Sequence, residues 1–383
     1  MVIKIDMCRF MKNKRLLLDV NSISGYIRNG YVFGVGRSTF ELLNALNKLI
    51  KEIPYEIILY SQNTKRVTPK GLFSFRSFHL LWPNRERYNK LLYSLGLKKR
   101  IIKYDLMHIP HNVDDVLDDI SNTIFTIHDA IVFRYPQYWN LTEEKSKHLK
   151  FVAQKCKAIV TCSESSKRDI SRYLNVPKSK VTSIPWGVNR EIFSPMYDDV
   201  YLHRIGIKGL YYFTSSANHP RKNLPLLLKS YRTYLAMGGQ GQLVILNPEE
   251  QHLIEIQDLI DARKIIVLRK ISDKELAVLY TNAQCSLMLS SYEGFGLPVL
   301  ESLACGTQVI CARNSSLTEA GGEIVDYISE MDDSIVAQKL FAYDNQDKAS
   351  ILDENVLESH LQNFSWEECA RKYIEFYKKQ LGV

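Results

Sequence analysis

Two glutamates that lie eight residues apart, Glu293 and Glu301, are the residues of this 383-residue chain best suited to chemistry. They flank the glycine-containing turn segment Gly294-Phe-Gly-Leu-Pro298. Pro298 suits the first position of a helix, where its missing N–H costs nothing, and Gly306 suits the end of that helix. The sequence therefore predicts a short helix that begins between the two acids.

The start of this predicted helix presents backbone amides that have no partner inside the helix. They belong to Phe295, Gly296 and Leu297. A helix N-terminus also carries partial positive charge, so it is a favourable place for a phosphate group. Carboxylates repel phosphate, and we therefore expect the two glutamates to accept hydrogen bonds from hydroxyl groups beside it. A diphosphate flanked by hydroxyl-bearing rings is a nucleotide sugar.

Arg221 and Lys222 follow an apolar run at residues 210–214 and a short loop. Sheets of α/β proteins place their ligand contacts at the carboxyl ends of strands. Arginine offers a forked donor and lysine a mobile point charge, and fixed cations of this kind stabilise charge that develops on a departing diphosphate. The alternative is an ordinary solvated Arg-Lys pair before a helix.

The bulk composition limits the classes of protein to consider. The length exceeds one ordinary core and suits two domains, and 45% apolar with 24% charged residues is typical of a globular protein. No apolar run reaches the roughly 18–20 residues of a membrane span. Seven scattered cysteines without C-x-x-C spacing favour reduced thiols in the cytoplasm over a zinc site. A net charge of +8 suits anionic substrates or an anionic membrane surface, and nucleic acid ranks last because no motif for it is present.

Short apolar runs alternate with helical patterns, which is typical of βαβ units and parallel sheets. One series of strands is expected near residues 16–20, 56–60, 106–109, 123–127, 158–161 and 181–184. A second is expected near 210–214, 243–246, 265–268, 285–289, 308–311 and 323–325. Two such series predict an α/β fold with two doubly wound domains, joined by a polar linker around residues 194–204.

The last segment of the chain has the pattern of a capped amphipathic helix. Ser365 and Glu368 form a capping-box motif. One face of the helix is expected to be buried, with the apolar residues Cys369, Tyr373, Ile374 and Tyr377. Because the helix follows the second domain, it could cross back to the first.

In their order and spacing, these features resemble the retaining glycosyltransferases of family 4, which have the GT-B architecture. The similarity covers nearly the whole chain and includes Gly34-Val-Gly-Arg37, Thr126-Ile-His-Asp129, Pro185-Trp-Gly-Val-Asn189, His219-Pro-Arg-Lys-Asn-Leu224, Glu293–Glu301 and Ser315-Ser-Leu-Thr-Glu319. The resemblance implies two Rossmann-like domains that face a central cleft. Residues 1–195 would bind the acceptor, 196–363 the nucleotide sugar, and 364–383 would pack back on the N-terminal domain.

The resemblance also implies roles for individual residues. Arg221 and Lys222 would neutralise the donor diphosphate, Glu293 would contact the transferred sugar, and Glu301 would accept hydrogen bonds from the ribose. The implied catalytic set is His128, Arg221, Lys222 and Glu293. The implied donor-binding set is Gly34, Gly36, Asn223, Phe295, Gly296, Leu297 and Glu301.

Several of these residues also have a structural interpretation. His128 ends an apolar strand and resembles the family histidine near the reacting carbon, but strand-end histidines also cap loops. His108 and His111 are left open between a structural and an acceptor-side role. Gly34 and Gly36 could be ordinary turn glycines. Their pattern lacks the third glycine of the dinucleotide fingerprint, which disfavours a nicotinamide-dependent oxidoreductase.

The segment 85–103 mixes cations with apolar residues at helical spacing. The simpler interpretation is a helix that packs one face on the core and leaves its cations in water. The alternative is a basic helix at the inner membrane surface, where each cation adds about 1 kcal/mol of attraction to anionic lipid.

The expected reaction, by resemblance, is transfer of a hexose to a glycan or lipid-linked glycan in bacterial surface polysaccharide or glycoconjugate synthesis. No cofactor is expected, and no metal, because the chain contains no Asp-x-Asp sequence. The alternative function is a catalytically silent partner subunit of a true transferase. Ser215 and Asn247 stand where the family usually has glycine, so the donor pocket is expected to be shaped differently.

Overall fold

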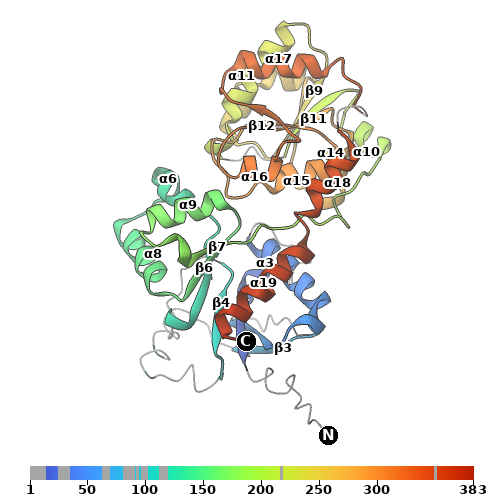
Figure 1. Ribbon diagram of the computed structural model, residues 1–383. Coiled ribbons are helices and arrows are strands. Elements are labelled where there is room, and N and C mark those ends of the chain that lie inside the picture. The colour runs from blue at the N-terminus through green and yellow to red at the C-terminus, as the bar shows by residue number, and fades with distance from the viewer. Residues whose placement is uncertain are drawn as a thin grey trace. The chain divides into compact units, whose positions relative to one another are not determined.

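The computed structural model describes residues 14–24, 35–62, 70–80, 91, 95, 102–111, 120–215, 219–348 and 352–383. The chain forms two compact units (Figure 1). Unit 1 comprises residues 1–187 together with 366–383, and unit 2 comprises residues 188–365. Residues 188–195, placed in the first domain from the sequence, thus lie in unit 2, where the N–H of Val188 donates to the carbonyl of Phe364 at 2.8 Å.

Unit 1 is built on a parallel sheet with the strand order β3-β2-β1-β4-β5-β6-β7. The strands are β1 (Arg15–Asp19), β2 (Glu56–Gln62), β3 (Arg76–Leu80), β4 (Leu106–Ile109), β5 (Thr123–Thr126), β6 (Ala158–Thr161) and β7 (Val181–Ser183). Its helices are α3 (Val35–Lys48), α6 (Ile131–Arg134), α7 (Pro136–Trp139), α8 (Glu143–Lys155), α9 (Glu164–Tyr173) and α19 (Trp366–Leu381).

Alternation along the central strand gives this sheet two buried faces. Leu16 and Leu18 of β1 belong to the apolar cluster that contains α3 and α19, whereas Leu17 belongs to the cluster that contains α8 and α9. Successive side chains of a strand point to opposite faces, so one apolar strand supplies both cores.

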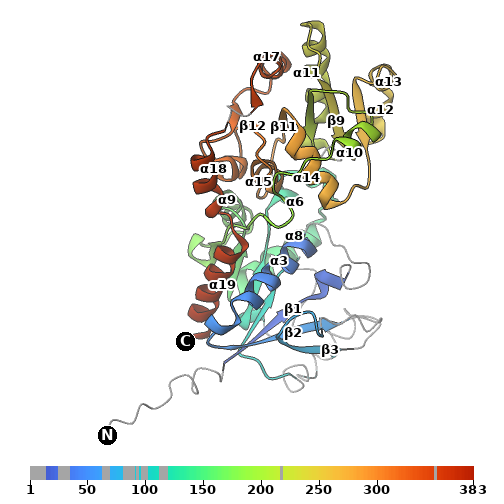
Figure 2. The same ribbon diagram turned by 90° about the vertical axis from the view of Figure 1, so that its right-hand side faces the viewer.

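The C-terminal helix α19 returns to unit 1 and packs against α3 (Figures 1 and 2). The face that the sequence predicted is buried: Cys369, Tyr373, Ile374 and Tyr377 are each at most 3% exposed. The hydroxyl of Tyr377 lies 2.6 Å from Nδ1 of His108, a fully buried residue of β4. This hydrogen bond ties the last helix to the centre of the sheet.

Unit 2 repeats the design with a parallel sheet in the order β10-β9-β8-β11-β12-β13. The strands are β8 (Tyr211–Thr214), β9 (Gln242–Leu246), β10 (Ile265–Leu268), β11 (Cys285–Met288), β12 (Val309–Ala312) and β13 (Asp326–Ile328). The helices are α10 (Asp199–Arg204), α11 (Leu224–Ala236), α12 (Gln251–Ile254), α13 (Gln257–Asp261), α14 (Asp273–Asn282), α15 (Leu297–Ala304), α16 (Leu317–Gly321), α17 (Asp333–Tyr343) and α18 (Glu354–Gln362).

The two doubly wound sheets confirm the predicted α/β class, with two differences at sheet edges. The last strand was expected at 323–325 but forms at Asp326–Ile328, after the turn that follows α16, in which Gly322 has φ +54°. Strand β3 was not predicted, because its sequence Arg-Ser-Phe-His-Leu is half polar and lacks an apolar run. Among the described residues, no helix is long and apolar enough to cross a bilayer.

We predict that Tyr377→Phe lowers the free energy of unfolding by about 1–3 kcal/mol, because it leaves a buried imidazole nitrogen of His108 without its partner. Urea unfolding followed by circular dichroism measures the change. Tyr197→Phe, at a position 77% exposed, is the matched control and should change stability little. Equal effects of the two substitutions would contradict the structural role of this bond.

Candidate functional site

In unit 2, the direction of strand addition reverses between β8 and β11. The chain adds β9 and β10 on one side of β8 and then places β11 on its other side. The loops that follow β8 and β11 therefore leave the same edge of the sheet from neighbouring strands. Ligands of open α/β sheets bind at such a switch point. These two loops carry Arg221, Lys222 and Glu293.

The described part of the loop after β8 contains the 3-10 turn Pro220–Lys222. Nδ1 of His219 accepts a hydrogen bond from the N–H of Arg221 at 3.2 Å and caps this turn. Asn223 ends it with φ +58°, a left-handed conformation that asparagine tolerates, and α11 begins at the next residue. Asn223 thus redirects the chain, and the two preceding cations are held in a fixed turn.

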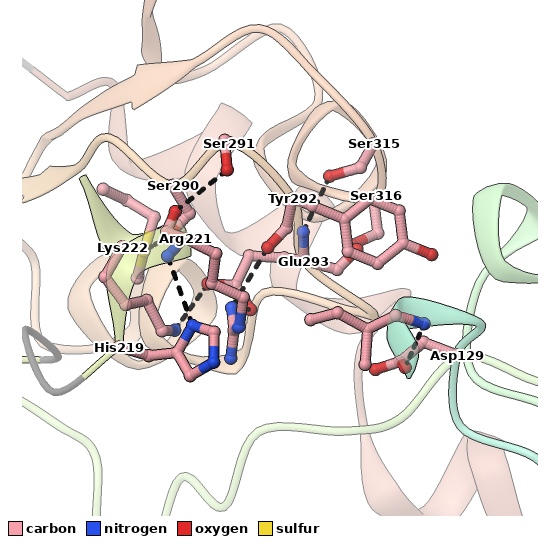
Figure 3. Close-up of polar contacts among 12 residues, drawn as sticks. Asp129, His219, Arg221, Lys222, Ser290, Ser291, Tyr292, Glu293, Ser315 and Ser316 are labelled. Carbon is pink, nitrogen blue, oxygen red and sulfur yellow. Dashed lines mark hydrogen bonds and ion pairs between the residues drawn. The ribbon is translucent and has the colours of Figure 1, made fainter. Parts of the chain in front are cut away.

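Both cations form ion pairs with one carboxylate (Figure 3). Nη1 of Arg221 lies 2.6 Å from Oε2 of Glu293, and Nζ of Lys222 lies 2.5 Å from Oε1. Nη1 of Arg221 also donates to the carbonyl of Tyr292 at 3.0 Å. The side chains of Glu293 and Lys222 are only 9% and 7% exposed, so the cluster is held largely out of water.

The two cations keep this carboxylate ionised. Burial alone would raise the pKa of Glu293, but the charges of Lys222 and Arg221 outweigh burial and lower that pKa to about 2. Burial also lowers the pKa of Lys222, while Glu293 acts in the opposite direction. At neutral pH, Glu293 is therefore a hydrogen-bond acceptor and cannot serve as a proton donor.

The helix expected between the two glutamates is α15, and Pro298 lies in its first turn. Gly296 precedes it with φ +107°, and a Cβ there would lie 3.1 Å from the Cβ of Ala320. Phe295 is 4% exposed and packs against Phe364, with ring centroids 6.0 Å apart, so its side chain faces the core. Leu297 begins the helix, and Gly306 follows its end with φ +75°.

Glu301 is 8% exposed on the second turn of α15. The hydroxyl of Tyr280 donates to its Oε2 at 3.4 Å. Ser215, one of the two positions where glycine was expected, lies near the same hydroxyl. Asn247, the other position, has φ +50°, so it adopts the left-handed conformation that glycine favours.

In unit 1, His128 follows β5 and lies beside Trp186, with ring centroids 5.2 Å apart. Among the described residues, neither of its buried ring nitrogens has a hydrogen-bond partner of ordinary geometry. Burial, and then the nearby His111, lower the pKa of His128 to about 4, and the Pro110 carbonyl offsets part of that shift. The ring is therefore neutral at pH 7. It lines a small cavity with Ser38, Thr39, Leu42, Pro110, Thr126, Trp186, Trp366 and Tyr373.

The two histidines left open by the sequence differ in their surroundings. Both ring nitrogens of His108 are used, by Tyr377 and by Thr126 at 2.8 Å, so this residue is structural. Nε2 of His111 lies 2.9 Å from Oδ1 of Asp19, a fully buried carboxylate at the end of β1. Gly36 lies in the first turn of α3, whereas Gly34 falls outside the described residues.

Two family models match successive parts of the chain. The model of glycosyltransferase family 4 matches residues 32–192, and the model of group 1 glycosyl transferases matches residues 205–330. The first ends just after unit 1, and the second spans the switch point of unit 2. The chain is a member of glycosyltransferase family 4.

Relatives of this family 4 chain include two curated bacterial proteins. A probable sucrose-phosphate synthase of Thermosipho melanesiensis is 29% identical over 58% of this chain and 57% of that protein. O-antigen chain mannosyltransferase B of Escherichia coli is 26% identical over 79% of each. The chain therefore spans little more than half of the first relative. HepE of Anabaena, solved in complex with UDP-glucose, has a TM-score of 0.69 and 14% identity over 95% of this chain and 99% of that one. That likeness shows the GT-B fold.

Several polar residues that contact the candidate residues of each unit were not singled out by the sequence. Ser315 and Ser316 hold the backbone of Glu293, Tyr280 contacts Glu301, and Asp19 pairs with His111. Ser315 and Ser316 were noted only as part of a motif, and Asp19 could have been found because it ends a strand. Most of the basic segment 85–103 lies outside the described residues.

We predict that Glu293→Gln lowers stability by about 3 kcal/mol at neutral pH, because two largely buried cations lose their counter-charge. The folded-state pKa of Glu293 lies below its ordinary value of 4.5, so its contribution is fully present above pH 4.5 and is lost as the pH falls toward 2. Urea unfolding of wild type and variant at several pH values tests this. The difference in free energy of unfolding between wild type and variant should become smaller as the pH falls.

The substitution Glu330→Gln, at an exposed position, is the control and should change stability little. If the free energies of unfolding of wild type and Glu293→Gln differ by the same amount from pH 7 down to about pH 2, that result would contradict the ion-paired state of Glu293.

Proposed function

We propose that this chain is a retaining glycosyltransferase that moves a hexose from a nucleotide-diphosphate sugar to a glycan or lipid-linked glycan. The acceptor would belong to surface polysaccharide or glycoconjugate synthesis, which the E. coli O-antigen relative supports. The observation that carries the proposal is the pair of largely buried cations at the switch point of unit 2, fixed by one ionised carboxylate.

The cations supply the electrostatic part of the reaction. Cleavage of the bond between sugar and phosphate builds negative charge on the leaving diphosphate. Arg221 and Lys222 come from one fixed turn, so they need little reorganisation to meet that charge. Nε of Arg221 is buried and, among the described residues, has no protein hydrogen-bond partner, so the hydrogen-bonding capacity of the guanidinium is not fully used by the protein.

The carboxylates supply acceptors for hydroxyl groups. Glu293 stays ionised at neutral pH, so it suits a hydrogen bond from the transferred sugar, and Glu301 suits one from the ribose. In the proposed retaining path, the acceptor hydroxyl attacks the face that the diphosphate leaves. Its proton passes to the leaving phosphate oxygen, so the enzyme needs no basic side chain. Neutral His128 would contribute a hydrogen bond near the reacting sugar.

Lys222→Ala should lower kcat by about 10²–10³, because one donor to the developing charge is lost. Glu293→Ala should have a comparable effect, because it frees both cations from their fixed positions. Turnover is measured with the donor chosen by a thermal-shift panel of nucleoside diphosphates, in which bound ligand raises the melting temperature.

Lys229→Ala is the matched control, since Lys229 is 72% exposed and pairs with Asp333 on the surface. Near-normal turnover by Lys222→Ala would count heavily against the proposal. Background turnover by the wild type with every likely donor and partner protein present would favour the silent-subunit alternative.

We predict that a metal chelator leaves turnover unchanged, because fixed cations at the site replace the divalent ion that would otherwise neutralise the diphosphate. The same assay is run with and without excess EDTA, and with a metal-dependent sugar transferase as the positive control. Loss of turnover that added Mg²⁺ or Mn²⁺ restores would contradict a metal-independent reaction.

A further inference from the structure

The backbone N–H and carbonyl of Glu293 are both hydrogen-bonded to one turn of the chain. The N–H of Glu293 donates to Oγ of Ser315 at 2.9 Å, and Oγ of Ser316 donates to the carbonyl of Glu293 at 2.8 Å. The two serines lie in the turn between β12 and α16, and β12 is the neighbour of β11 in the sheet. Figure 3 shows the Ser315 bond beside the ion-pair cluster.

Further hydrogen bonds hold the loop that precedes Glu293. Oγ of Ser315 donates to Oδ1 of Asn314 at 2.9 Å, and Nδ2 of Asn314 donates to the carbonyl of Ser290 at 2.9 Å. On the opposite side, the N–H of Ser291 donates to the carbonyl of Arg221 at 2.8 Å. The loop is therefore fixed to both neighbouring segments, one of which carries the cations.

Ser315 adopts a conformation that serine normally avoids. Its φ is +43°, in the left-handed region where glycine has no steric cost. Residues held in such regions need a compensating interaction. Here the hydroxyl of Ser315 supplies two hydrogen bonds, one of which fixes the peptide that carries the Glu293 carboxylate.

We propose that Ser315 is a positioning residue that sets where the Glu293 carboxylate meets Arg221 and Lys222, an inference that rests on the function proposed above. The Ser315 hydroxyl is occupied by protein partners, and its effect on sugar transfer passes through Glu293. Displacement of that carboxylate displaces both cations with it, since each is bonded to one of its oxygens.

Two substitutions at Ser315 separate the effect of the hydroxyl group from the effect of the backbone conformation. Ser315→Ala removes the hydroxyl and keeps the steric cost of the positive φ, whereas Ser315→Gly removes both. We expect both variants to lower kcat by about 10- to 100-fold, the scale of a small misplacement of a catalytic group. The glycine variant should nevertheless melt at a higher temperature than the alanine variant.

The comparison with glycine distinguishes positioning from a merely structural role. If Ser315 only shaped the turn, Ser315→Gly would restore wild-type kcat, and that result would overturn the inference. Ser334→Ala, which removes a hydroxyl from the first turn of α17, is the control and should keep wild-type kcat. If neither Ser315 variant folds, Ser316→Ala removes the other bond to Glu293 and should show the same loss of kcat.

A second measurement remains informative if the proposed function is wrong and no sugar donor is turned over by the wild type. Loosening of Glu293 weakens its ion pairs, so the loss of stability between pH 4.5 and pH 2 should be smaller in Ser315→Gly than in wild type. An unchanged acid dependence would overturn the inference whatever substrate the protein uses. An active wild type whose Ser315 variants match it in kcat would overturn the inference and leave the proposed function intact.

Discussion

A single carboxylate shared between two cations is the interaction on which the rest of this site depends. Two positive charges placed side by side and largely out of water would repel each other and lose their hydration. Glu293 offsets both costs, with one oxygen for Arg221 and the other for Lys222. One acid for two cations leaves the cluster net positive. The site is thus stable without a ligand and still attracts an anion.

The sheet topology explains why Glu293 meets Arg221 and Lys222, although it lies 71 positions after Lys222 in the chain. Their loops leave neighbouring parallel strands at the point where strand addition reverses. Each loop is then held by short-range hydrogen bonds, from His219 on one side and from Ser315 and Ser316 on the other. These contacts fix the backbone on both sides of the ion pairs.

The features that sequence reasoning anticipated are those with strong local signals. Pro298 and Gly306 mark the limits of α15, and apolar runs mark the central strands, because each signal acts within a few residues. The place of Arg221 and Lys222 after a strand was expected from the apolar run before them, whereas their ion pairs with Glu293 were not predicted. Strand β3 has no apolar run, and β13 forms later than expected, because edge strands are specified by pairing with a neighbour. The roles of Ser315 and Tyr280 depend on tertiary contacts that no local pattern records.

The central claim is that the cations fixed by Glu293 hold the diphosphate of a nucleotide. A crystal structure of the protein with a bound nucleoside diphosphate tests this most directly. We expect phosphate oxygens within hydrogen-bonding distance of the Arg221 guanidinium and the Lys222 ammonium, with Glu293 still paired to both. A nucleotide bound elsewhere, with the three side chains unchanged and free of phosphate contacts, would contradict it.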